Sequence, residues 1–181
     1  MARFKPFIGE NYYKSAYGVR VLILGESHYG DQEDEAEDFT QMVVKDNAYT
    51  PGSPFFSRVT KLLMLSEEYP TDTERYEAWQ QVSFYNFVQE FVGRQGRIRP
   101  TPQMWKDAMP MFIEVARGLK PDVIVVLGYD LWNKAPELPG DLPVEWCSIK
   151  HPAGGMSYNE SFVAFTESLE KARSRAALTR I

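Results

Sequence analysis

The chain has 181 residues, of which 44% are hydrophobic and 14% aromatic, and it carries a net charge of −5 with a single cysteine. This length suits one domain with a substantial core, and no run approaches the roughly 18 consecutive apolar residues of a transmembrane helix. One cysteine excludes an internal disulfide and a four-thiolate iron–sulfur cluster within the chain, and the acidic balance disfavours non-specific binding to a polyanion.

The charge is distributed unevenly along the chain. Residues 31–38 are mostly acidic, whereas residues 94–106 contain four basic side chains and no acidic one. A local basic face is therefore still expected on this acidic protein. The opening residues lack the apolar core of a signal peptide, so we expect a cytoplasmic protein without membrane contacts.

The first predicted strand is the apolar segment 20–25, which runs directly into a polar loop. A continuous apolar run that ends at a turn signal is typical of a strand buried on both faces of a parallel sheet. Two helices are predicted next. Ser53 and Pro54 suit the first turn of a helix over 53–66, and Thr-Asp-Thr-Glu suits a capping box that begins a helix over 71–81.

Strands and helices alternate through the rest of the chain. The segment 122–127 is the clearest strand, because it is rich in β-branched residues and follows a Lys-Pro pair. The predicted elements, in chain order, are a strand at 82–88, a helix at 102–119, the strand at 122–127, a helix at 129–135, a strand at 144–149 and a helix at 159–178.

This alternation predicts an α/β protein in which right-handed crossovers place helices on both faces of a parallel sheet. We therefore expect a single domain over residues 1–181. Its predicted architecture is a three-layer α/β/α sandwich around a central four-stranded parallel sheet.

The loop after the first strand is the most informative segment: Gly25-Glu26-Ser27-His28-Tyr29-Gly30. Open α/β sheets bind their ligands at the carboxyl ends of the strands, which is where this loop is predicted to lie. Gly25 would let a ligand approach the backbone, and the Glu26 carboxylate could orient or deprotonate a water. Alternatively, Glu26 caps the following helix and His28 is a polar surface residue.

Asn86 interrupts the apolar strand predicted at 82–88. Burying its amide unpaired would cost roughly 1–3 kcal/mol, so it either satisfies a neighbouring loop or binds a ligand. An amide donates and accepts hydrogen bonds side by side, as recognition of a nucleobase edge requires. Without further evidence, hydrogen bonding to a neighbouring loop is the favoured interpretation of this asparagine.

His151 follows the last predicted strand and precedes Pro152, in a segment rich in turn residues. It is therefore either part of a simple turn or a donor to negative charge that develops during a reaction. The chain has only two histidines, and both fall in loops at predicted strand ends.

Other site types are disfavoured. The chain has no Gly-x-Gly-x-x-Gly fingerprint, no phosphate loop and no His-Glu-x-x-His pattern, and the acidic run 31–38 lacks the spacing of a calcium loop. A Ser27–His28 nucleophile pair is disfavoured because no Gly-x-Ser-x-Gly elbow is present. We accordingly predict no metal and no cofactor.

Taken together, the two loops resemble those of the uracil-DNA glycosylase superfamily. Members carry a first loop of the form Gly-Gln-Asp-Pro-Tyr-His or Gly-Glu-Ala-Pro-Gly, an asparagine on the second strand, and a His-Pro-Ser motif after the last strand. The matching positions here are the loop 25–30, Asn86 and His151-Pro152-Ala153. The resemblance spans residues 20 to about 165.

The resemblance implies a DNA glycosylase that hydrolyses the bond between a sugar and uracil, or another damaged or modified base, after base flipping. Glu26 would position the attacking water, and His151 would stabilise the anionic base as it leaves. Asn86 would recognise the flipped base, against which Tyr29 would pack. The other implied substrate-binding residues are Gly25, Ser27, His28 and Phe84, with Phe55 or Phe56 as alternative stacking partners.

The same resemblance implies contacts to DNA from the second loop and from the basic segment. Met156 would be the apolar wedge inserted into the helix, and the glycines before it would approach phosphate. The implied DNA-contacting residues are Gly154, Gly155, Met156, Ser157, Arg97 and Arg99.

The chain also departs from the family pattern, since Ser27 stands where the best-known branch has the water-activating Asp, and Gly154-Gly155 replace Pro-Leu-Ser. Two alternatives therefore stay open: a catalytically inactive nucleic-acid or nucleotide-binding module of the same fold, and a hydrolase of small nucleosides or nucleotides. We expect a monomer whose partner is DNA, single- or double-stranded, or another ligand that contains a nucleobase.

Overall fold

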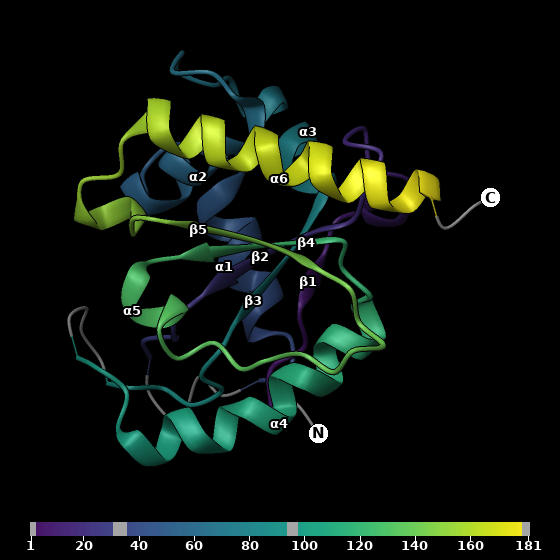
Figure 1. The fold of residues 1–181 in the computed structure, drawn as a ribbon. Coiled ribbons are helices and arrows are strands. Elements are labelled where there is room, and N and C mark those ends of the chain that lie inside the picture. Colours follow the sequence, from purple (N-terminus) through teal and green to yellow (C-terminus); the bar gives the residue numbers. More distant parts are fainter. Residues whose placement is uncertain (1–2, 31–35, 94–97, 179–181) are drawn as a thin grey trace.

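The computed structural model describes residues 3–30, 36–93 and 98–178. Its centre is a five-stranded mixed sheet with the strand order β1-β3-β2-β4-β5. The strands are β1 (Phe7–Ile8), β2 (Val21–Gly25), β3 (Val82–Asn86), β4 (Val123–Leu127) and β5 (Glu145–Ile149). All four predicted strands are present and run parallel to one another (Figure 1).

The expectation of a four-stranded, purely parallel sheet is wrong at one edge. β1 pairs antiparallel with β3, with Phe7 opposite Phe84 and Ile8 opposite Ser83. A two-residue strand carries no hydrophobic period of its own, so only its pairing with β3 reveals it. Backbone bonds from the Gly9 amide to the Val82 carbonyl of β3 and from the Asn11 amide to the Gln80 carbonyl at the end of α3 continue the contact beyond the strand.

Helices cover both faces of the sheet, as predicted. The α-helices are α1 (Phe39–Ala48), α2 (Pro54–Met64), α3 (Asp72–Gln80), α4 (Pro102–Leu119), α5 (Tyr129–Trp132) and α6 (Tyr158–Leu178), and the short 3₁₀ helices are η1 (Tyr12–Lys14) and η3 (Pro152–Gly154). Figure 1 shows α2, α3 and α6 on one side of the sheet and α4 and α5 on the other.

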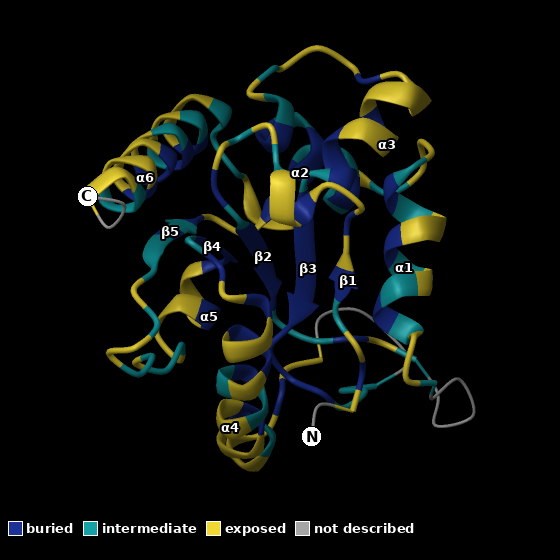
Figure 2. Cartoon of the chain, turned by 90° about the vertical axis from the view of Figure 1, so that its right-hand side faces the viewer, coloured by how far each residue is buried: buried dark blue, intermediate teal, exposed yellow. Residues whose placement is uncertain are grey.

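Successive side chains of each strand point to opposite faces of the sheet, and each face has its own apolar core. Val21 and Ile23 of β2 pack with α1, α2, α3 and α6, whereas Leu22 and Leu24 pack with α4 and α5. β2, β3 and β4 are buried along their whole length, as Figure 2 shows, which confirms strands covered on both faces.

The helix boundaries follow local signals closely. Ser53 accepts a hydrogen bond from the Phe56 amide at the start of α2, and Thr71 with Glu74 forms a complete capping box at the start of α3. α1 was not predicted.

Among the described residues, no helix combines the length and apolar character that crossing a bilayer requires.

Candidate functional site

A cavity of about 750 Å³ opens at the carboxyl ends of the strands. Polar groups line one part of it, and aromatic side chains line the rest. Most of the residues singled out in the sequence border this cavity: Gly25, Glu26, Ser27, His28, Tyr29, Phe55, Phe56, Phe84, Asn86, Arg99, His151, Ala153 and Gly154. The two loops expected at strand ends therefore border one and the same cleft.

Three of the other residues singled out for DNA contact do not line this cavity. Gly155 is exposed outside the cavity with φ +82°, and Met156 is half-buried against the apolar core instead of projecting from the loop. Ser157 lies at the start of α6, where its hydroxyl accepts a hydrogen bond from the Glu160 amide. Arg97 lies outside the described residues.

Gly25 leaves room for the Asn86 side chain. A Cβ atom at position 25 would lie 2.1 Å from the Asn86 Oδ1 and 3.2 Å from the Phe84 ring. Gly25 and Asn86 are directly opposite each other in the register of β2 and β3. The glycine is therefore required by the close approach of a neighbouring side chain.

We expect Gly25→Ala to lower the free energy of unfolding by about 1–3 kcal/mol, because overpacking strains a filled site. Urea denaturation measures this loss. Gly118→Ala is the matched control, since nothing lies within 4 Å of its Cβ position on α4. That control should be neutral or stabilising by about 0.5–1 kcal/mol. Equal stability of Gly25→Ala and wild type would contradict the steric role of Gly25.

His28 is buried and holds the Asn86 amide in place. The His28 Nδ1 lies 3.0 Å from the Asn86 Nδ2, and the His28 Nε2 lies 2.8 Å from the Thr40 Oγ1. An amide nitrogen only donates, so Nδ1 is an acceptor and the Nε2 proton points to Thr40. The rings of Phe4 and Phe39 pack edge-on against the imidazole.

Two sequence interpretations are settled by this arrangement. The alternative of His28 as a surface residue is wrong, because only 3% of it is exposed. The Asn86 amide satisfies a neighbouring loop, as the structural interpretation of this asparagine required. The same amide also borders the cavity, so binding a ligand stays a prediction.

Burial lowers the pKa of His28 to about 4, whereas an unfolded chain titrates its histidines near 6.5. Between these pH values the unfolded chain binds a proton that the native protein does not. The free energy of unfolding should therefore fall as the pH drops from about 6.5 to about 4, by up to about 1.4 kcal/mol per unit.

Urea denaturation at pH 7 and pH 5 checks this dependence. The difference between the two pH values should be smaller in His28→Gln than in wild type, whereas His151→Gln, at the cleft rim, should keep most of it. An unchanged difference in His28→Gln would assign the pH dependence to other groups.

Glu26 is part of an ion-paired cluster at the cavity wall. Its Oε1 lies 3.4 Å from the Arg99 Nη1, and Arg99 also pairs with Asp130 on α5. Burial raises the pKa of Glu26, the Arg99 and Lys134 charges oppose this rise, and Asp130 adds to it. Glu26 does not cap a helix, because residues 27–30 are not helical and the next helix among the described residues, α1, begins after Asp38. The alternative role for Glu26 is therefore wrong.

His151 stands at the opening of η3 with a defined protonation state. Its Nδ1 accepts a hydrogen bond of 3.1 Å from the Ala153 amide, so the neutral ring carries its proton on Nε2. Partial burial lowers the pKa of His151, and the nearby Arg99 charge lowers it further. The neutral imidazole is therefore favoured, with one N–H available to a ligand.

An aromatic wall runs from His151 to the sheet. The ring centroids of Phe55 and His151 are 5.5 Å apart, those of Phe55 and Phe56 are 5.1 Å apart, and those of Phe56 and Phe84 are 5.9 Å apart. All four rings line the cavity. All three phenylalanines named as stacking candidates in the sequence therefore lie where a flat ligand would meet them.

Sequence reasoning missed the wall contributed by α1 and the partner contributed by α5. Phe39, Val43 and Asn47 of α1 line the cavity, Thr40 bonds His28, and Asp130 bonds Arg99. The apolar residues Phe39, Val43 and Val44 recur at helical spacing after Asp38, which was the available signal.

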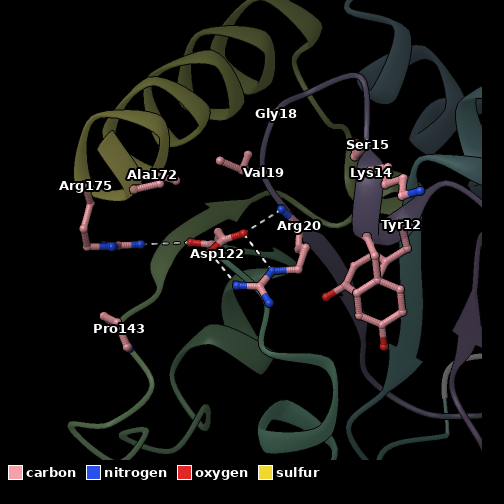
Figure 3. Close-up of a pocket in the computed structure, with 12 residues that line it drawn as sticks. Tyr12, Lys14, Ser15, Gly18, Val19, Arg20, Asp122, Pro143, Ala172 and Arg175 are labelled. Carbon is pink, nitrogen blue, oxygen red and sulfur yellow. Dashed lines mark hydrogen bonds and ion pairs between the residues drawn. The ribbon is translucent and has the colours of Figure 1, made fainter. Parts of the chain in front are cut away.

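A second cavity of about 670 Å³ lies at the opposite, amino ends of β2 and β4 (Figure 3). Its charged groups join elements to one another. Arg20 binds Asp122 through Nε and Nη2, both at 3.0 Å, and Arg175 donates to the Asp122 carbonyl and pairs with Glu145. Burial works to raise the pKa of Asp122, but Arg20 outweighs it and holds that pKa low. This network ties β2, β4, β5 and α6 together.

The carboxyl-end cavity is accordingly the candidate functional site, since it alone of these two contains the loops singled out by sequence. No protein-family profile matches the chain, and no curated protein matches it significantly.

Proposed function

We propose that this protein hydrolyses the N-glycosidic bond of a nucleobase in DNA. The observation that carries the proposal is the convergence of three groups on one aromatic-walled cavity. Glu26, Asn86 and His151 follow or end β2, β3 and β5, respectively, and all three border that cavity. Its volume lies within the range of small-ligand pockets, about 300–1,000 Å³.

The reaction would add water across the bond between the sugar C1′ and the base nitrogen. Glu26 orients the water and takes one of its protons while the oxygen bonds to C1′. The bond to the base breaks, and its electron pair goes to the base nitrogen. A carboxylate with a raised pKa is a stronger base than an ordinary glutamate, which supports this role for Glu26.

His151 would stabilise the leaving base. A neutral imidazole with its proton on Nε2 donates a hydrogen bond to developing negative charge without giving up the proton in the ground state. The Ala153 amide at Nδ1 already fixes that tautomer. The donor is therefore oriented before the substrate arrives, which is the condition for strong electrostatic stabilisation.

Asn86 would recognise the edge of the base. His28 holds the Asn86 Nδ2, which leaves the Oδ1 and the second Nδ2 proton for a ligand. Phe55, Phe56 and Phe84 would supply the apolar contact to the ring. The Ser27 hydroxyl has no hydrogen-bond partner among the described residues and borders the same space, so a ligand group can satisfy it.

The finer comparison with uracil-DNA glycosylases belongs to the same proposal. It is supported by four parallel strands in the order β3-β2-β4-β5 and by the position of both signature-like loops at their carboxyl ends. The antiparallel β1 adds to that arrangement without altering the site.

The Arg99 ion pair favours one competing function. Arg99 neutralises part of the Glu26 charge, and Ser27 supplies no second carboxylate. A nucleobase-binding module without catalysis is therefore the second candidate.

A cleavage assay separates the two functions. Labelled oligonucleotides that carry uracil, hypoxanthine, xanthine or a modified cytosine would be incubated with the protein, and alkali-labile abasic sites would be scored. Product from one base, lost in both Glu26→Ala and His151→Ala, is the expected result. No product from any base, with retained binding, would replace hydrolysis by the binding function.

A further inference from the structure

We infer that the site takes a nucleotide that is already unstacked, in single-stranded DNA, in preference to a base paired in a duplex. This inference rests on the proposed function and specifies its substrate. Three independent features of the cavity rim carry it: the second loop, the exposed rings and the pairing of the charges.

The second loop has no apolar side chain to push into a duplex. Enzymes that flip a base out of a helix commonly insert an apolar wedge that holds the stack open. Here the exposed residues after Pro152 are Ala153, Gly154 and Gly155, and Met156 packs against the core. Arg58 of α2 anchors the loop through the Pro152 carbonyl. The wedge expected at Met156 is therefore turned inward.

Ile98, the neighbour of the cavity residue Arg99 in the chain, does not replace the wedge. It is 43% exposed, but its side chain lies along Gly93, where a Cβ atom would come within 2.3 Å of the Ile98 Cδ1. The side chain therefore covers backbone and does not project. A duplex would meet no rigid apolar probe from Ile98 or from the second loop.

Exposed aromatic rings lie just beyond the carboxyl ends of two neighbouring strands, on a loop and at the start of α5. Tyr29 follows β2 and is 42% exposed, and Tyr129 follows β4 and is 49% exposed. Tyr29 lines the cavity, and Tyr129 precedes Asp130, which pairs with the cavity residue Arg99. Flat exposed rings beside a base pocket are stacking platforms for unpaired bases.

Among the described residues, the charges that line the cavity give a duplex little attraction. Arg99 is held between Glu26 and Asp130, so two carboxylates face one guanidinium. Duplex binding draws most of its non-specific affinity from cations placed on phosphates. A site whose affinity comes from stacking and from the base edge depends less on such contacts, and an unpaired base supplies both.

The test uses Glu26→Gln, so that binding is measured without turnover. Fluorescence anisotropy would compare one labelled uracil-containing strand alone, in a duplex, and in a duplex with the uracil inside an unpaired bubble. Strands with hypoxanthine or xanthine would be run in parallel. We expect the single strand and the bubble to bind about 10- to 100-fold more tightly than the duplex, because flipping from a duplex costs a few kcal/mol.

Tyr129 supplies the second arm of the test. In the Glu26→Gln background, Tyr129→Ala should weaken single-strand binding by about 5- to 30-fold, whereas Tyr129→Phe keeps the ring and should stay within about twofold. Equal effects of the two substitutions would remove stacking at this position from the inference.

The outcomes separate this inference from the hydrolytic function. Selective single-strand binding without abasic product from wild type would support the inference and overturn hydrolysis. Cleavage in duplex DNA at least as fast as in single strands would overturn the inference and leave hydrolysis standing. Equal binding of all probes, or binding of none, would overturn the inference.

Discussion

Glu26→Gln should lower the rate constant for base release by about 10²- to 10⁴-fold while leaving the fold and the binding of the oligonucleotide intact. Glutamine keeps the size and a hydrogen-bonding oxygen but cannot accept the proton of the attacking water. Single-turnover cleavage with enzyme in excess measures the chemical step directly.

Asp130→Asn is the matched control, because Asp130 is the second carboxylate on Arg99 but its side chain is 72% exposed. It should change the rate only slightly. A rate in Glu26→Gln equal to that of wild type would exclude Glu26 as the base.

The pH dependence of the rate of base release tests the role of Glu26 independently. The reaction requires the Glu26 carboxylate, and burial raises the pKa of Glu26 above its ordinary value of 4.5. The rate should therefore fall with falling pH at a midpoint above 4.5. Glu26→Gln should remove this acidic limb, and an unchanged limb would assign it to another group.

Asn86→Ala should remove discrimination between bases, with a loss of about 1–3 kcal/mol in binding of the preferred base, or about 5- to 150-fold in Kd. Alanine offers neither the acceptor nor the donor of the amide. Competition binding with free nucleobases or with single-stranded oligonucleotides measures the loss.

Stability must be followed alongside binding, because Asn86→Ala also leaves the His28 Nδ1 without its donor. The free energy of unfolding should fall by about 1–3 kcal/mol, and circular dichroism should still report the native fold. Asn47→Ala is the control. Asn47 lines the same cavity, but its amide bonds the Val43 carbonyl within α1. Wild-type discrimination in Asn86→Ala would refute the assignment of Asn86 to base recognition.

His28 is the residue for which the sequence was least informative. In the sequence it is one of three polar residues in a loop, and its neighbours give no sign of burial. The structure encloses it between Phe4 and Phe39 and joins it to Asn86, 58 positions away. Its role is therefore to position another residue, which no local pattern indicates.

Arg99 illustrates the same limit for charges. Composition alone placed it in a basic segment suited to phosphate contacts. In the fold it lies between Glu26 and Asp130, residues far from it in the chain. This pairing reduces the attraction of Arg99 for the phosphates of a duplex and so supports the inferred preference for single-stranded DNA.

The sequence by itself determined the four parallel strands, five of the helices, and the edge of the sheet where the candidate site lies. These features follow from local chemistry: apolar runs need burial, caps satisfy free amides, and loops after parallel strands meet at one edge. Only the tertiary structure decided the antiparallel β1, the cavity wall from α1, the orientation of the Asn86 amide and the inward packing of Met156. Each of these depends on contacts between distant segments, whose energies are set by packing and by the pairing of buried polar groups, and a linear pattern does not encode them.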